Sequence, residues 1–421
     1  MLDMKLIREQ PELVKQGAAN KNEKCDIDKV LQLDEKRREI IREVERLKAD
    51  RNQASADIAK KKKAGESADD AIAATRQLGD QIKALDGSLA EVEDELHQLL
   101  IWIPNIPHEG APVGKDESAN VVVRDWGEKP AFDFKPQAHW DLGAKLGIID
   151  LEASAAVSGS GFYVLKGLGA RLQRALVNYM MDTHAANGFT EICAPYLVTA
   201  DTMYGTGQLP KMAEDMYLIE NDSLYLIPTA EVPVTNLYKK QIVNEADLPI
   251  QMVAHSPCFR REAGAAGKDT RGMIRVHQFD KVEMVKIVHP DTSYDELENL
   301  VAQAERILQG LKLHYRVSEL ATGDLSFASA KCYDLELWAA GIERYLEISS
   351  VANFEAFQAR RMSLRYRTAD KKTDFPHTLN GSGVALARLI PAVLENNQNP
   401  DGTVTIPGVL RPYMGGVEKI G

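Results

Sequence analysis

The sequence predicts an α+β protein in which a long antiparallel helical hairpin, a coiled-coil arm, precedes a domain on an antiparallel β-sheet flanked by helices. Three observations lead to this prediction. Between residues 26 and 100, apolar side chains recur with the spacing of a heptad. Pro104 and Pro107 then end the helical pattern. From residue 167 onward, short β-branched runs are grouped with helical stretches, as in α+β domains.

The composition limits the class of protein. The 421 residues are 44% apolar, enough for a sizeable core, and 51 basic against 62 acidic side chains give a formal charge of −11. No apolar run approaches the length of about 20 residues that spans a bilayer, and residues 1–10 lack the apolar core of a signal peptide. The four cysteines stand far apart without a CxxC pair, which argues against a disulfide scaffold or zinc ribbon and fits a reducing cytoplasm.

Two heptad seams predict the hairpin. The first consists of Val30, Leu33, Arg37, Ile40, Val44, Leu47, Arg51, Ala54 and Ile58, and the second of Thr75, Leu78, Ile82, Leu85, Leu89, Val92, Leu96 and Leu99. The small polar segment 64–67 separates them, and no proline interrupts either seam. Two seams joined by a short turn predict two antiparallel helices, each roughly 50 Å long at about 1.5 Å per residue.

Charge is divided unequally between the two helices. Residues 27–63 contain twelve basic and eight acidic side chains, a balance of +4, whereas residues 68–100 contain two basic and eight acidic ones, a balance of −6. The first helix ends in four lysines at 60–63. Two interpretations stay open: the helices neutralise one another around a solvated tip, or the first helix and the tip contact a phosphate backbone.

The remainder of the chain is expected to form a second domain. We assign the arm to residues 1–105, a linker rich in proline, glycine and charge to 106–135, and the second domain to 136–421. Helices are predicted at 169–187, 293–311 and 383–396. Strands are predicted at 196–198, 224–227, 282–288 and 344–348.

The residues most suggestive of chemistry lie in segment 259–283, which is predicted to form a β-hairpin. Arg260 and Glu262 would share one face of its first strand, and the returning strand would alternate Arg275, His277, Phe279, Lys281 and Glu283. Arginine binds phosphate oxygens, a phenyl ring stacks on a base, and a carboxylate accepts from an exocyclic amine. Local chemistry is equally compatible with a nucleotide site and with a charged surface hairpin. No P-loop and no strand–GxGxxG–helix unit is present.

Segment 259–272 (FRREAGAAGKDTRG) with its continuation to Glu283 resembles the second signature motif of class II aminoacyl-tRNA synthetases, and of bacterial-type seryl-tRNA synthetases in particular. Other similar segments are LIREQPELV at 6–14, QAHWDLG at 137–143, FYVLKG at 162–167, TAEVPVTN at 229–236, EISSVANF at 347–354 and IPGVLRPYMGG at 406–416. TLNGSG at 378–383 opens a predicted helix bearing Arg388 and resembles the third signature motif. The likeness covers nearly the whole chain.

The resemblance implies an enzyme. Serine and ATP would give seryl-adenylate and pyrophosphate, and tRNA(Ser), with tRNA(Sec) as a further acceptor, would take the seryl group. The hairpin would bind tRNA, and the rest would be a class II catalytic domain. The first class II motif, the helix from Gly169 with the strand ending near Pro195, would build a homodimer interface. Because Cys193, Cys258 and Cys332 are dispersed, no zinc is expected.

The resemblance also assigns an ATP site. Arg260 would bind the α-phosphate and the serine carboxylate, and Glu262 the adenine amine. Phe279 would stack on one face of adenine, while Arg388 would cover the other face and reach the terminal phosphate, with Arg275 on the phosphate side. Arg261, Val276, Ile348 and Ser349, next to these residues in the sequence, are also expected to contact ATP. Glu347 and Ser350 would hold Mg²⁺, which prefers hard oxygen ligands.

A serine site is implied beside the ATP site. Thr229, Ala230 and Glu231 would hold the amino end of serine. Glu283 and Ser382, with Asn380 near them, would meet the side-chain hydroxyl and close the pocket.

Without the family, several of these residues have plainer interpretations. Glu231 and Glu347 would be strand carboxylates in ion pairs, Arg388 a surface arginine, and Ser382 the N-cap of the helix at 383–396. His277 is expected to be structural. Arg261, Gly161 and Pro391 depart from the family pattern, and Pro391 is expected to kink the helix after Arg388.

Two other functions compete with the tRNA ligase. A serine-activating ligase that loads a non-tRNA acceptor, such as a carrier protein, would lack the long arm, which this chain has. A non-catalytic coiled-coil protein with a degenerate synthetase domain would have lost Arg260, Glu283, Glu347 or Arg388, and all four are present.

Overall fold

The structure, a computed structural model, describes residues 1–263 and 271–421. The chain divides into two compact units. The helical unit comprises Leu2–Ala19 and Glu23–Pro104, and the sheet unit comprises Met1, Asn20–Asn22 and Asn105–Gly421. The glycine-rich part of the segment singled out above, residues 264–270, lies outside the described residues.

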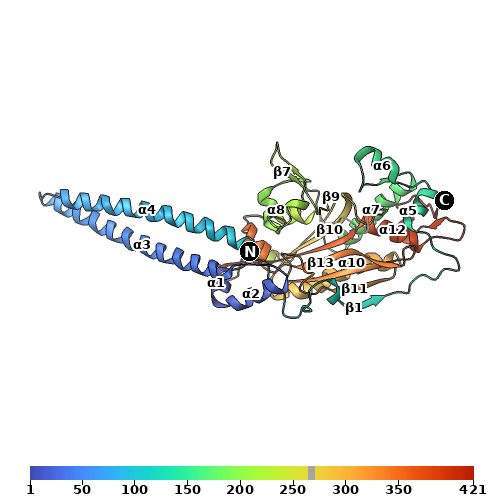
Figure 1. The fold of residues 1–421 in the computed structure, drawn as a ribbon, viewed down its shortest axis with the longest axis horizontal. Helices are drawn as coiled ribbons and strands as arrows, with labels where there is room; N and C mark the ends of the chain where they lie inside the picture. Colours follow the sequence, from blue (N-terminus) through green and yellow to red (C-terminus); the bar gives the residue numbers. More distant parts are fainter. Residues whose placement is uncertain (264–270) are drawn as a thin grey trace. The chain divides into compact units, whose positions relative to one another are not determined.

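The helical unit is the expected hairpin. Two short helices, α1 (Met4–Glu9) and α2 (Pro11–Asn20), precede the long helices α3 (Ile27–Lys63) and α4 (Asp69–Leu100). The two long helices lie side by side in Figure 1. Every position of both heptad seams is buried or half-buried, including the fully packed Val44, Leu47 and Ile82. The spacing of apolar residues therefore identified the contacting faces correctly.

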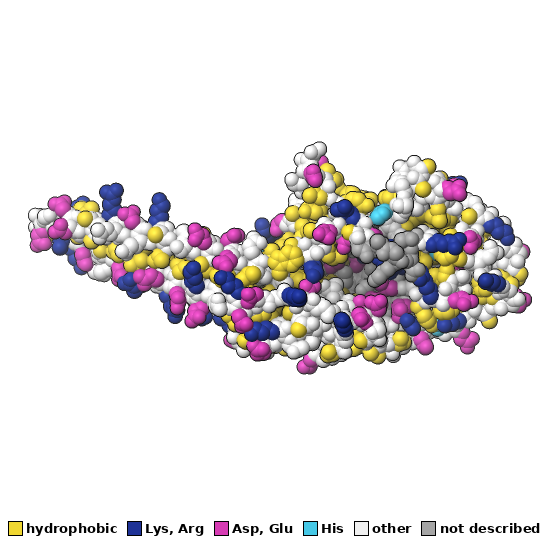
Figure 2. Space-filling model, in the orientation of Figure 1, with side chains coloured by type: hydrophobic (Ala, Val, Ile, Leu, Met, Phe, Trp, Pro, Cys, Tyr) yellow, Lys and Arg dark blue, Asp and Glu magenta, His cyan; other side chains and the backbone are white. Residues whose placement is uncertain are grey.

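Charged side chains also pair across the hairpin. Basic residues of α3 meet acidic residues of α4 in the pairs Lys29–Glu95 at 3.1 Å, Arg37–Glu93 at 2.8 Å and Lys48–Asp86 at 3.9 Å. Each pair is exposed, so each contributes about 0–1 kcal/mol. The four lysines at 60–63 are exposed at the tip, and Figure 2 shows both signs of charge spread along the hairpin surface. Mutual neutralisation thus accounts for part of the basic charge of α3, and not for the tip.

The sheet unit is built on a large, mostly antiparallel sheet. In the described residues its strand order is β1-β11-β12-β13-β16-β10-β9-β4, and the pair β4–β9 is parallel. The strands are β1 (Val121–Trp126), β4 (Thr190–Glu191), β9 (Ile250–Phe259), β10 (Gln278–Val288), β11 (Tyr315–Glu319), β12 (Lys331–Ala339), β13 (Arg344–Asn353) and β16 (His377–Ala385). Helices α7 (Leu168–Ala186), α10 (Ser293–Gly310) and α12 (Leu386–Asn396) pack against it. This arrangement confirms the predicted α+β class.

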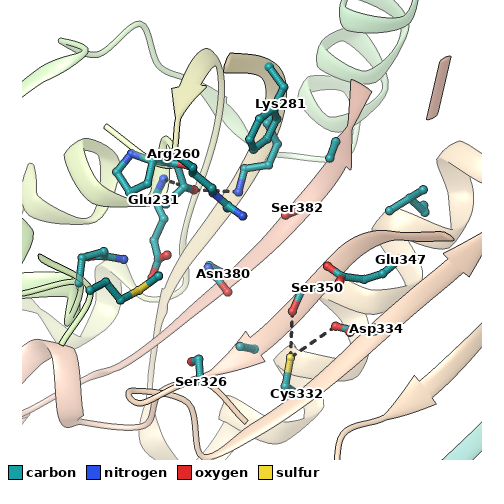
Figure 3. Close-up of a pocket in the computed structure, with 18 of the residues that line it drawn as sticks. Glu231, Arg260, Lys281, Ser326, Cys332, Asp334, Glu347, Ser350, Asn380 and Ser382 are labelled. Atoms are coloured by element: carbon teal, nitrogen blue, oxygen red, sulfur yellow. Dashed lines mark hydrogen bonds between the residues drawn. The ribbon is translucent and has the colours of Figure 1, made fainter. Parts of the chain in front are cut away.

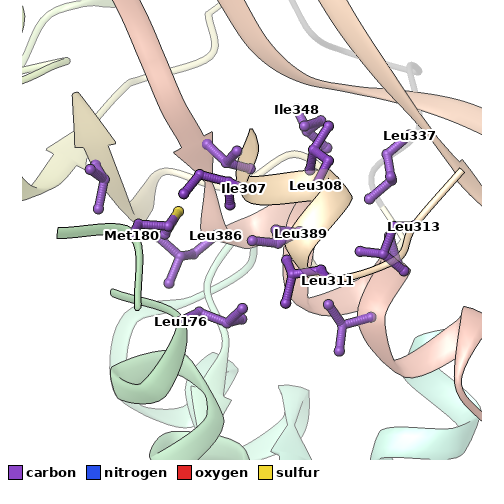
Figure 4. Packing of buried hydrophobic residues seen from close by; sticks show 14 of the residues in the cluster. Leu176, Met180, Ile307, Leu308, Leu311, Leu313, Leu337, Ile348, Leu386 and Leu389 are labelled. Carbon is purple, nitrogen blue, oxygen red and sulfur yellow. The ribbon is translucent and has the colours of Figure 1, made fainter. Parts of the chain in front are cut away.

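The main core lies between the sheet and these three helices. Leu176 of α7, Leu308 of α10 and Leu389 of α12 are fully buried and contribute to one cluster, together with Leu337 of β12 and Ile348 of β13 (Figure 4). Residues on the same strands point alternately to this core and to the opposite face of the sheet. The opposite face is therefore available for polar side chains.

Smaller elements complete the sheet unit. The helices are α5 (His139–Lys145), α6 (Leu151–Ser158), α8 (Ala200–Thr206), α9 (Glu231–Asn236) and α11 (Phe357–Met362). Four small sheets comprise β2 (Ile149–Asp150) with β3 (Val164–Leu165); β5 (Leu197–Thr199), β7 (Leu224–Leu226) and β6 (Leu218–Ile219); β15 (Thr373–Asp374), β14 (Arg365–Arg367) and β8 (Ile242–Asn244); and β17 (Val404–Thr405) with β18 (Lys419–Ile420). Among the described helices, none combines the length and apolar character needed to cross a membrane.

The central hairpin is shorter than the sequence predicted. Strand β9 ends at Phe259 and β10 begins at Gln278, so Arg260, Glu262, Arg275 and His277 lie beyond the strands. The left-handed backbone of Glu262, with φ of 50°, is incompatible with a continuing strand. His277 donates its backbone N–H to the carbonyl of Gly161, a residue outside the hairpin. Alternation along the strand therefore holds for Phe279, Lys281 and Glu283 alone.

The helix expected from residue 383 begins later, at Leu386. Residues 377–385 form β16, which pairs with both β10 and β13. Backbone pairing on two sides thus overrode the local helical pattern, and the interpretation of Ser382 as an N-cap is wrong. Pro391 lies inside α12, which continues past it to Asn396.

The segment expected to be a linker contains an edge strand. β1 pairs antiparallel with β11, although all six of its residues are exposed. The Val121-Val122-Val123 run is a typical strand sequence, and the surrounding Pro, Gly and charged residues, which predict a linker, conceal it.

The buried core gives the first prediction. Leu308→Ala should lower the free energy of unfolding of the sheet unit by about 2–5 kcal/mol, because a fully buried leucine leaves a cavity that its neighbours refill only in part. The measurement is urea unfolding followed by circular dichroism. Leu218→Ala, at a leucine that is 47% exposed, is the matched control and should change stability by less than about 1 kcal/mol. Equal losses in the two variants would contradict the described core.

Candidate active site

A cavity of about 430 Å³ opens on the polar face of the large sheet. Its volume is that of a small-molecule site. Most of the site residues predicted from the sequence line this cavity. They are Thr229, Glu231, Arg260, Glu262, Arg275, Val276, Phe279, Glu347, Ile348, Ser350, Asn380, Ser382 and Arg388. They come from β10, β13, β16, the start of α12, the start of α9 with the residues just before it, and the segments flanking residues 264–270. Figure 3 shows Asn380 and Ser382 on β16 with the other groups on either side of them.

One part of the cavity, the arginine end, contains Arg260, Arg275 and Arg388 with Glu262 and Phe279. The Arg260 guanidinium carbon lies 5.2 Å from the centre of the Phe279 ring, and its Nε donates to the Pro228 carbonyl at 3.4 Å. Arg275 Nη1 lies 2.7 Å from Glu262 Oε2. These contacts hold two cationic forks and an aromatic face at the cavity wall, a set suited to phosphate and to a heterocyclic ring.

Arg388 joins the arginine end to the next strand. Its Nη1 donates to the Glu347 carbonyl at 2.6 Å and lies 3.3 Å from Glu347 Oε2. Its Nε donates to the Ile274 carbonyl at 3.3 Å. Arg388 is therefore a fixed residue of the cavity wall, which the interpretation as a simple surface arginine does not explain.

A second part, the acidic end, is lined by Thr229, Glu231 and Lys281, and the buried Glu283 contacts Thr229 and Lys281 from behind the lining. Lys281 Nζ donates to Thr229 Oγ1 at 2.8 Å and forms an ion pair with Glu283. Thr229 Oγ1 in turn donates to Glu283 Oε2 at 3.2 Å. Glu283 Oε1 is buried without a hydrogen-bond partner among the described residues. Such an unpaired carboxylate oxygen is costly unless a ligand supplies a donor.

Glu231 is the most perturbed acid of this end. Burial, followed by the negative charge of Glu283, raises its pKa to about 7, against the opposing hydrogen bond from Gln358. Gln358 Nε2 donates to Glu231 Oε1 at 2.7 Å, and Thr378 Oγ1 donates to Gln358 Oε1 at 2.7 Å. Glu231 begins helix α9, which corrects its alternative interpretation as a strand carboxylate.

A third group lies on neighbouring strands β12 and β13, where Asp334 and Ser350 lie next to Cys332 and Glu347 lies farther along β13 (Figure 3). Cys332 Sγ lies 3.1 Å from Ser350 Oγ. Burial, and then the Glu347 carboxylate, raises the pKa of Asp334 well above its ordinary value. In the described residues, no group of three or more His, Cys, Asp or Glu side chains has the arrangement of a metal site.

Some expected site residues do not line the cavity. Glu283 lies behind Thr229 and Lys281, and Ala230 is buried in a neighbouring apolar cluster. Arg261 is exposed, and Ser349 donates its hydroxyl to the Ser382 carbonyl.

The sequence analysis assigned no site role to several cavity or supporting residues, among them Lys281, Cys332, Asp334 and Gln358. Lys281 alone carried a signal, because it alternates with Phe279 and Glu283 on β10. The other three become neighbours of the site only through strand pairing and the packing of α11, which local sequence does not encode.

Two family models match the chain. One describes a seryl-tRNA synthetase N-terminal domain and matches residues 1–107. The other describes a tRNA synthetase class II core domain for G, H, P, S and T and matches residues 215–397.

Similar proteins cover the full length. A serine–tRNA ligase of Carboxydothermus hydrogenoformans is 54% identical over 422 residues, with 100% of this chain and 99% of the relative covered. The crystal structure of a seryl-tRNA synthetase from Pyrococcus horikoshii complexed with ATP has a TM-score of 0.94 at 38% identity, covering 100% and 99% of the two chains. A cytoplasmic serine–tRNA ligase from Naegleria fowleri in complex with AMP has a TM-score of 0.90 at 30% identity, covering 100% and 98%.

The raised pKa of Glu231 predicts a pH-dependent stability. A carboxyl with a raised folded-state pKa contributes stability that is complete below its unfolded pKa and is lost as pH rises through about 7. Glutamine does not ionise, so the stability of Glu231→Gln does not fall as Glu231 loses its proton. The stability of the variant relative to the natural chain should therefore increase by up to about 3 kcal/mol between pH 5 and pH 8, measured by urea unfolding.

Glu220→Gln, at an exposed turn, is the control for removal of a carboxylate and should show no such increase. A difference between Glu231→Gln and the natural chain that stays constant with pH would contradict the raised pKa.

Proposed function

This chain belongs to the seryl-tRNA synthetase family, and on that premise we propose how its cavity and arm carry out the two steps of the reaction. It is an ATP-dependent serine–tRNA ligase with a class II catalytic domain. Serine is first joined to AMP, and the seryl group then passes to the 3′ end of tRNA. The observation that carries the proposal is one cavity with an arginine end for a nucleotide and, next to it, a buried acidic end for a small cationic, hydroxyl-bearing substrate.

The arginine end is proposed to bind ATP. Arg260 would contact the α-phosphate and the serine carboxylate, and Arg275 the phosphates. Phe279 and Arg388 would enclose the adenine ring, and Glu262 would accept from its amine. The ion pair between Glu262 and Arg275 supports this assignment, because it fixes both side chains before the nucleotide arrives. Arg261, Val276, Ile348 and Ser349 would supply the surrounding wall and backbone.

The acidic end is proposed to bind serine. Thr229, Ala230 and Glu231 would receive the ammonium group, and Glu231 is the better acceptor in its ionised form. Glu283 would accept from the serine hydroxyl, and its unpaired Oε1 supports this role. Ser382 faces Glu283 in the register of β10 and β16, and Asn380 lies two residues away on the same strand.

These polar groups would select serine by hydrogen bonding. Alanine lacks the hydroxyl and would leave Glu283 unpaired, so the cavity should reject it strongly. Threonine adds only a methyl group, and its exclusion depends on shape, which is the weaker discrimination.

Magnesium fits the residues of β12 and β13. Asp334, Glu347 and Ser350 offer only oxygen ligands, which Mg²⁺ prefers, and burial followed by the charge of Glu347 raises the pKa of Asp334. We assign Glu347 and Ser350 as the ligands. The bound ion would neutralise phosphate charge in the transition state.

The activation step requires no nucleophile from the protein. The serine carboxylate oxygen attacks the α-phosphorus, forming an oxygen–phosphorus bond while the bond to the β-phosphate oxygen breaks and pyrophosphate leaves. A ribose hydroxyl of tRNA then attacks the seryl carbonyl carbon, and AMP leaves. The side chains of this cavity position the reactants and balance their charge, which is the main requirement of phosphoryl chemistry.

The arm, residues 1–105, is proposed to bind tRNA(Ser) and also tRNA(Sec). The N-terminal family match and the exposed lysines at 60–63 support a tRNA partner over a carrier-protein acceptor. Residues 136–421 would then be the catalytic domain, joined through 106–135. Helix α7 with the segment up to Pro195 is proposed as a homodimer surface. None of the four cysteines, all of which lie in the described part of the chain, forms a disulfide. Action in the cytoplasm without zinc is proposed from the family resemblance.

Serine transfer is the direct test of the function. With ATP and Mg²⁺, the protein should attach labelled serine to total bacterial tRNA as base-labile, acid-precipitable label, and labelled alanine should give none. Absence of serine label together with absence of serine-dependent pyrophosphate exchange would overturn the proposal.

Thr229→Val tests the acidic end. Loss of the hydroxyl that joins Lys281 to Glu283 should raise KM for serine about 10- to 100-fold, the effect of about 1.5–3 kcal/mol for a hydrogen bond to a charged group. KM for ATP should stay unchanged in pyrophosphate exchange. Thr190→Val, at an exposed threonine of β4, is the matched control. An unchanged KM for serine would refute the assignment of this end.

Shortening the hairpin tests the arm. Lys48 of α3 and Asp86 of α4 face each other, so replacement of residues 49–85 by a short turn removes the outer half at a matched level. Pyrophosphate exchange should persist, and tRNA charging should fall to background. A full-length variant with alanine at 60–63 separates the tip lysines from the remainder of the arm. Normal charging by the shortened chain would show that the arm has another role.

A further inference from the structure

A buried pair of hydrogen-bonded side chains in the sheet unit, His139 and Glu395, takes no part in the assigned chemistry. His139 begins helix α5 and Glu395 lies near the end of α12, and both side chains are fully buried. His139 Nδ1 lies 2.8 Å from Glu395 Oε1. Glu395 also accepts the backbone N–H of His139 at 2.9 Å through Oε1 and that of Gly341 at 2.9 Å through Oε2. Three donors thus satisfy the buried carboxylate.

The other nitrogen of His139 binds a segment that leads into the cavity. The Met273 backbone N–H donates to His139 Nε2 at 3.2 Å. Since a carboxylate only accepts and an amide N–H only donates, the imidazole is the neutral tautomer with its proton on Nδ1. Both ring nitrogens of His139 therefore form hydrogen bonds, one to Glu395 and one to the Met273 backbone.

The residues next to His139 hold the same segment. The Arg271 guanidinium lies 4.6 Å from the Trp140 ring centre, and Arg271 Nη2 is 3.6 Å from Asp141 Oδ1. Gly272 has φ of 76°, and a Cβ added there would lie 2.2 Å from His139 Nε2 and 2.8 Å from Trp140. Three consecutive residues of α5 therefore seat residues 271–273.

This seat is connected to the arginine end. Directly after Met273, the Ile274 carbonyl accepts from Arg388 Nε, and Arg275 pairs with Glu262. Helix α12 carries Arg388 at its start and Glu395 near its end. The position of residues 273–275 is thus defined at one side by His139 and at the other by Arg388, and α12 links the two.

We propose that His139 is a positioning residue for ATP: its neutral imidazole, oriented by Glu395, binds the Met273 N–H and thereby sets the place of Arg275 and of the carbonyl that holds Arg388. The inference rests on the proposed nucleotide role of the arginine end. A displacement of such groups by about 1 Å can cost about a hundredfold in rate.

Two substitutions at His139 separate its two hydrogen bonds. The amide of His139→Asn overlaps the Nδ1 position, so it keeps a donor for Glu395 and loses the acceptor for Met273. The amide of His139→Gln overlaps the Nε2 position, so it keeps the acceptor for Met273 and loses the donor to Glu395.

We expect His139→Asn to raise both KM for ATP in pyrophosphate exchange and the Kd for ATP in calorimetry by about tenfold, without changing KM for serine. His139→Gln should stay within about twofold of the natural chain for ATP, even if its melting temperature falls.

Gly272→Ala perturbs the same seat from the opposite side. It should reproduce the ATP-specific defect of His139→Asn. Gly147→Ala is the matched control, because Gly147 also has a positive φ, of 67°, but an added Cβ would meet nothing within 4 Å. Gly147→Ala shares the backbone strain and should leave KM for ATP unchanged.

The outcomes are decisive for each claim separately. Unchanged ATP parameters in His139→Asn and Gly272→Ala would overturn the inference, as would equal losses in the Asn and Gln variants. If the natural chain showed no serine-dependent exchange, the proposed function would fail, while the calorimetric affinities for ATP would still decide the role of His139.

Discussion

Strand β16 runs between β10 and β13, and its backbone hydrogen bonds to both neighbours determine where the polar groups of the cavity lie. β10 brings Phe279 and Lys281 to the cavity, β13 brings Glu347 and Ser350, and β16 itself brings Asn380 and Ser382. Because strand spacing and side-chain alternation are fixed by the ladder, a shift of one residue would turn these groups toward the apolar core. The chemistry of the cavity therefore depends on backbone pairing more than on any single polar contact.

The same strand determines the position of Arg388. β16 passes directly into α12, whose apolar residues pack in the main core while its first turn projects Arg388 into the cavity. Core packing thus supplies the rigidity that a long, flexible arginine lacks by itself. Helix α12 is also held near its end, where Glu395 accepts from the Gly341 backbone N–H. The helix that carries the partly exposed Arg388 is therefore fixed at both of its ends.

Charge in the cavity is arranged by burial. Glu283 is fully buried, and its ion pair with Lys281 and its hydrogen bond from Thr229 offset the desolvation of the carboxylate. Glu231 accepts a hydrogen bond from the neutral amide of Gln358, and burial together with the charge of Glu283 raises its pKa to about 7. The two carboxylates thus differ in their partners: Glu283 pairs with Lys281, whereas Glu231 has a pKa raised to about 7.

The heptad seams and the strand runs follow from periodicities of 3.5 and 2, and Pro104 ends the helical pattern. The amino-acid sequence by itself therefore determined the hairpin, the α+β class and parts of strands β5, β7, β10 and β13. It also predicted a set of site residues, but only through the likeness of whole segments to a known family; local chemistry left a nucleotide site and a surface hairpin equally open. The tertiary structure decided the rest. In the structure, β9 ends at Phe259 and residues 383–385 belong to β16. Lys281 and Asp334 line the cavity, and His139 pairs with Glu395, which lies 256 residues away in the sequence. These features depend on contacts between residues far apart in the chain, whose energies outweigh local preference and leave no periodic signal in the sequence.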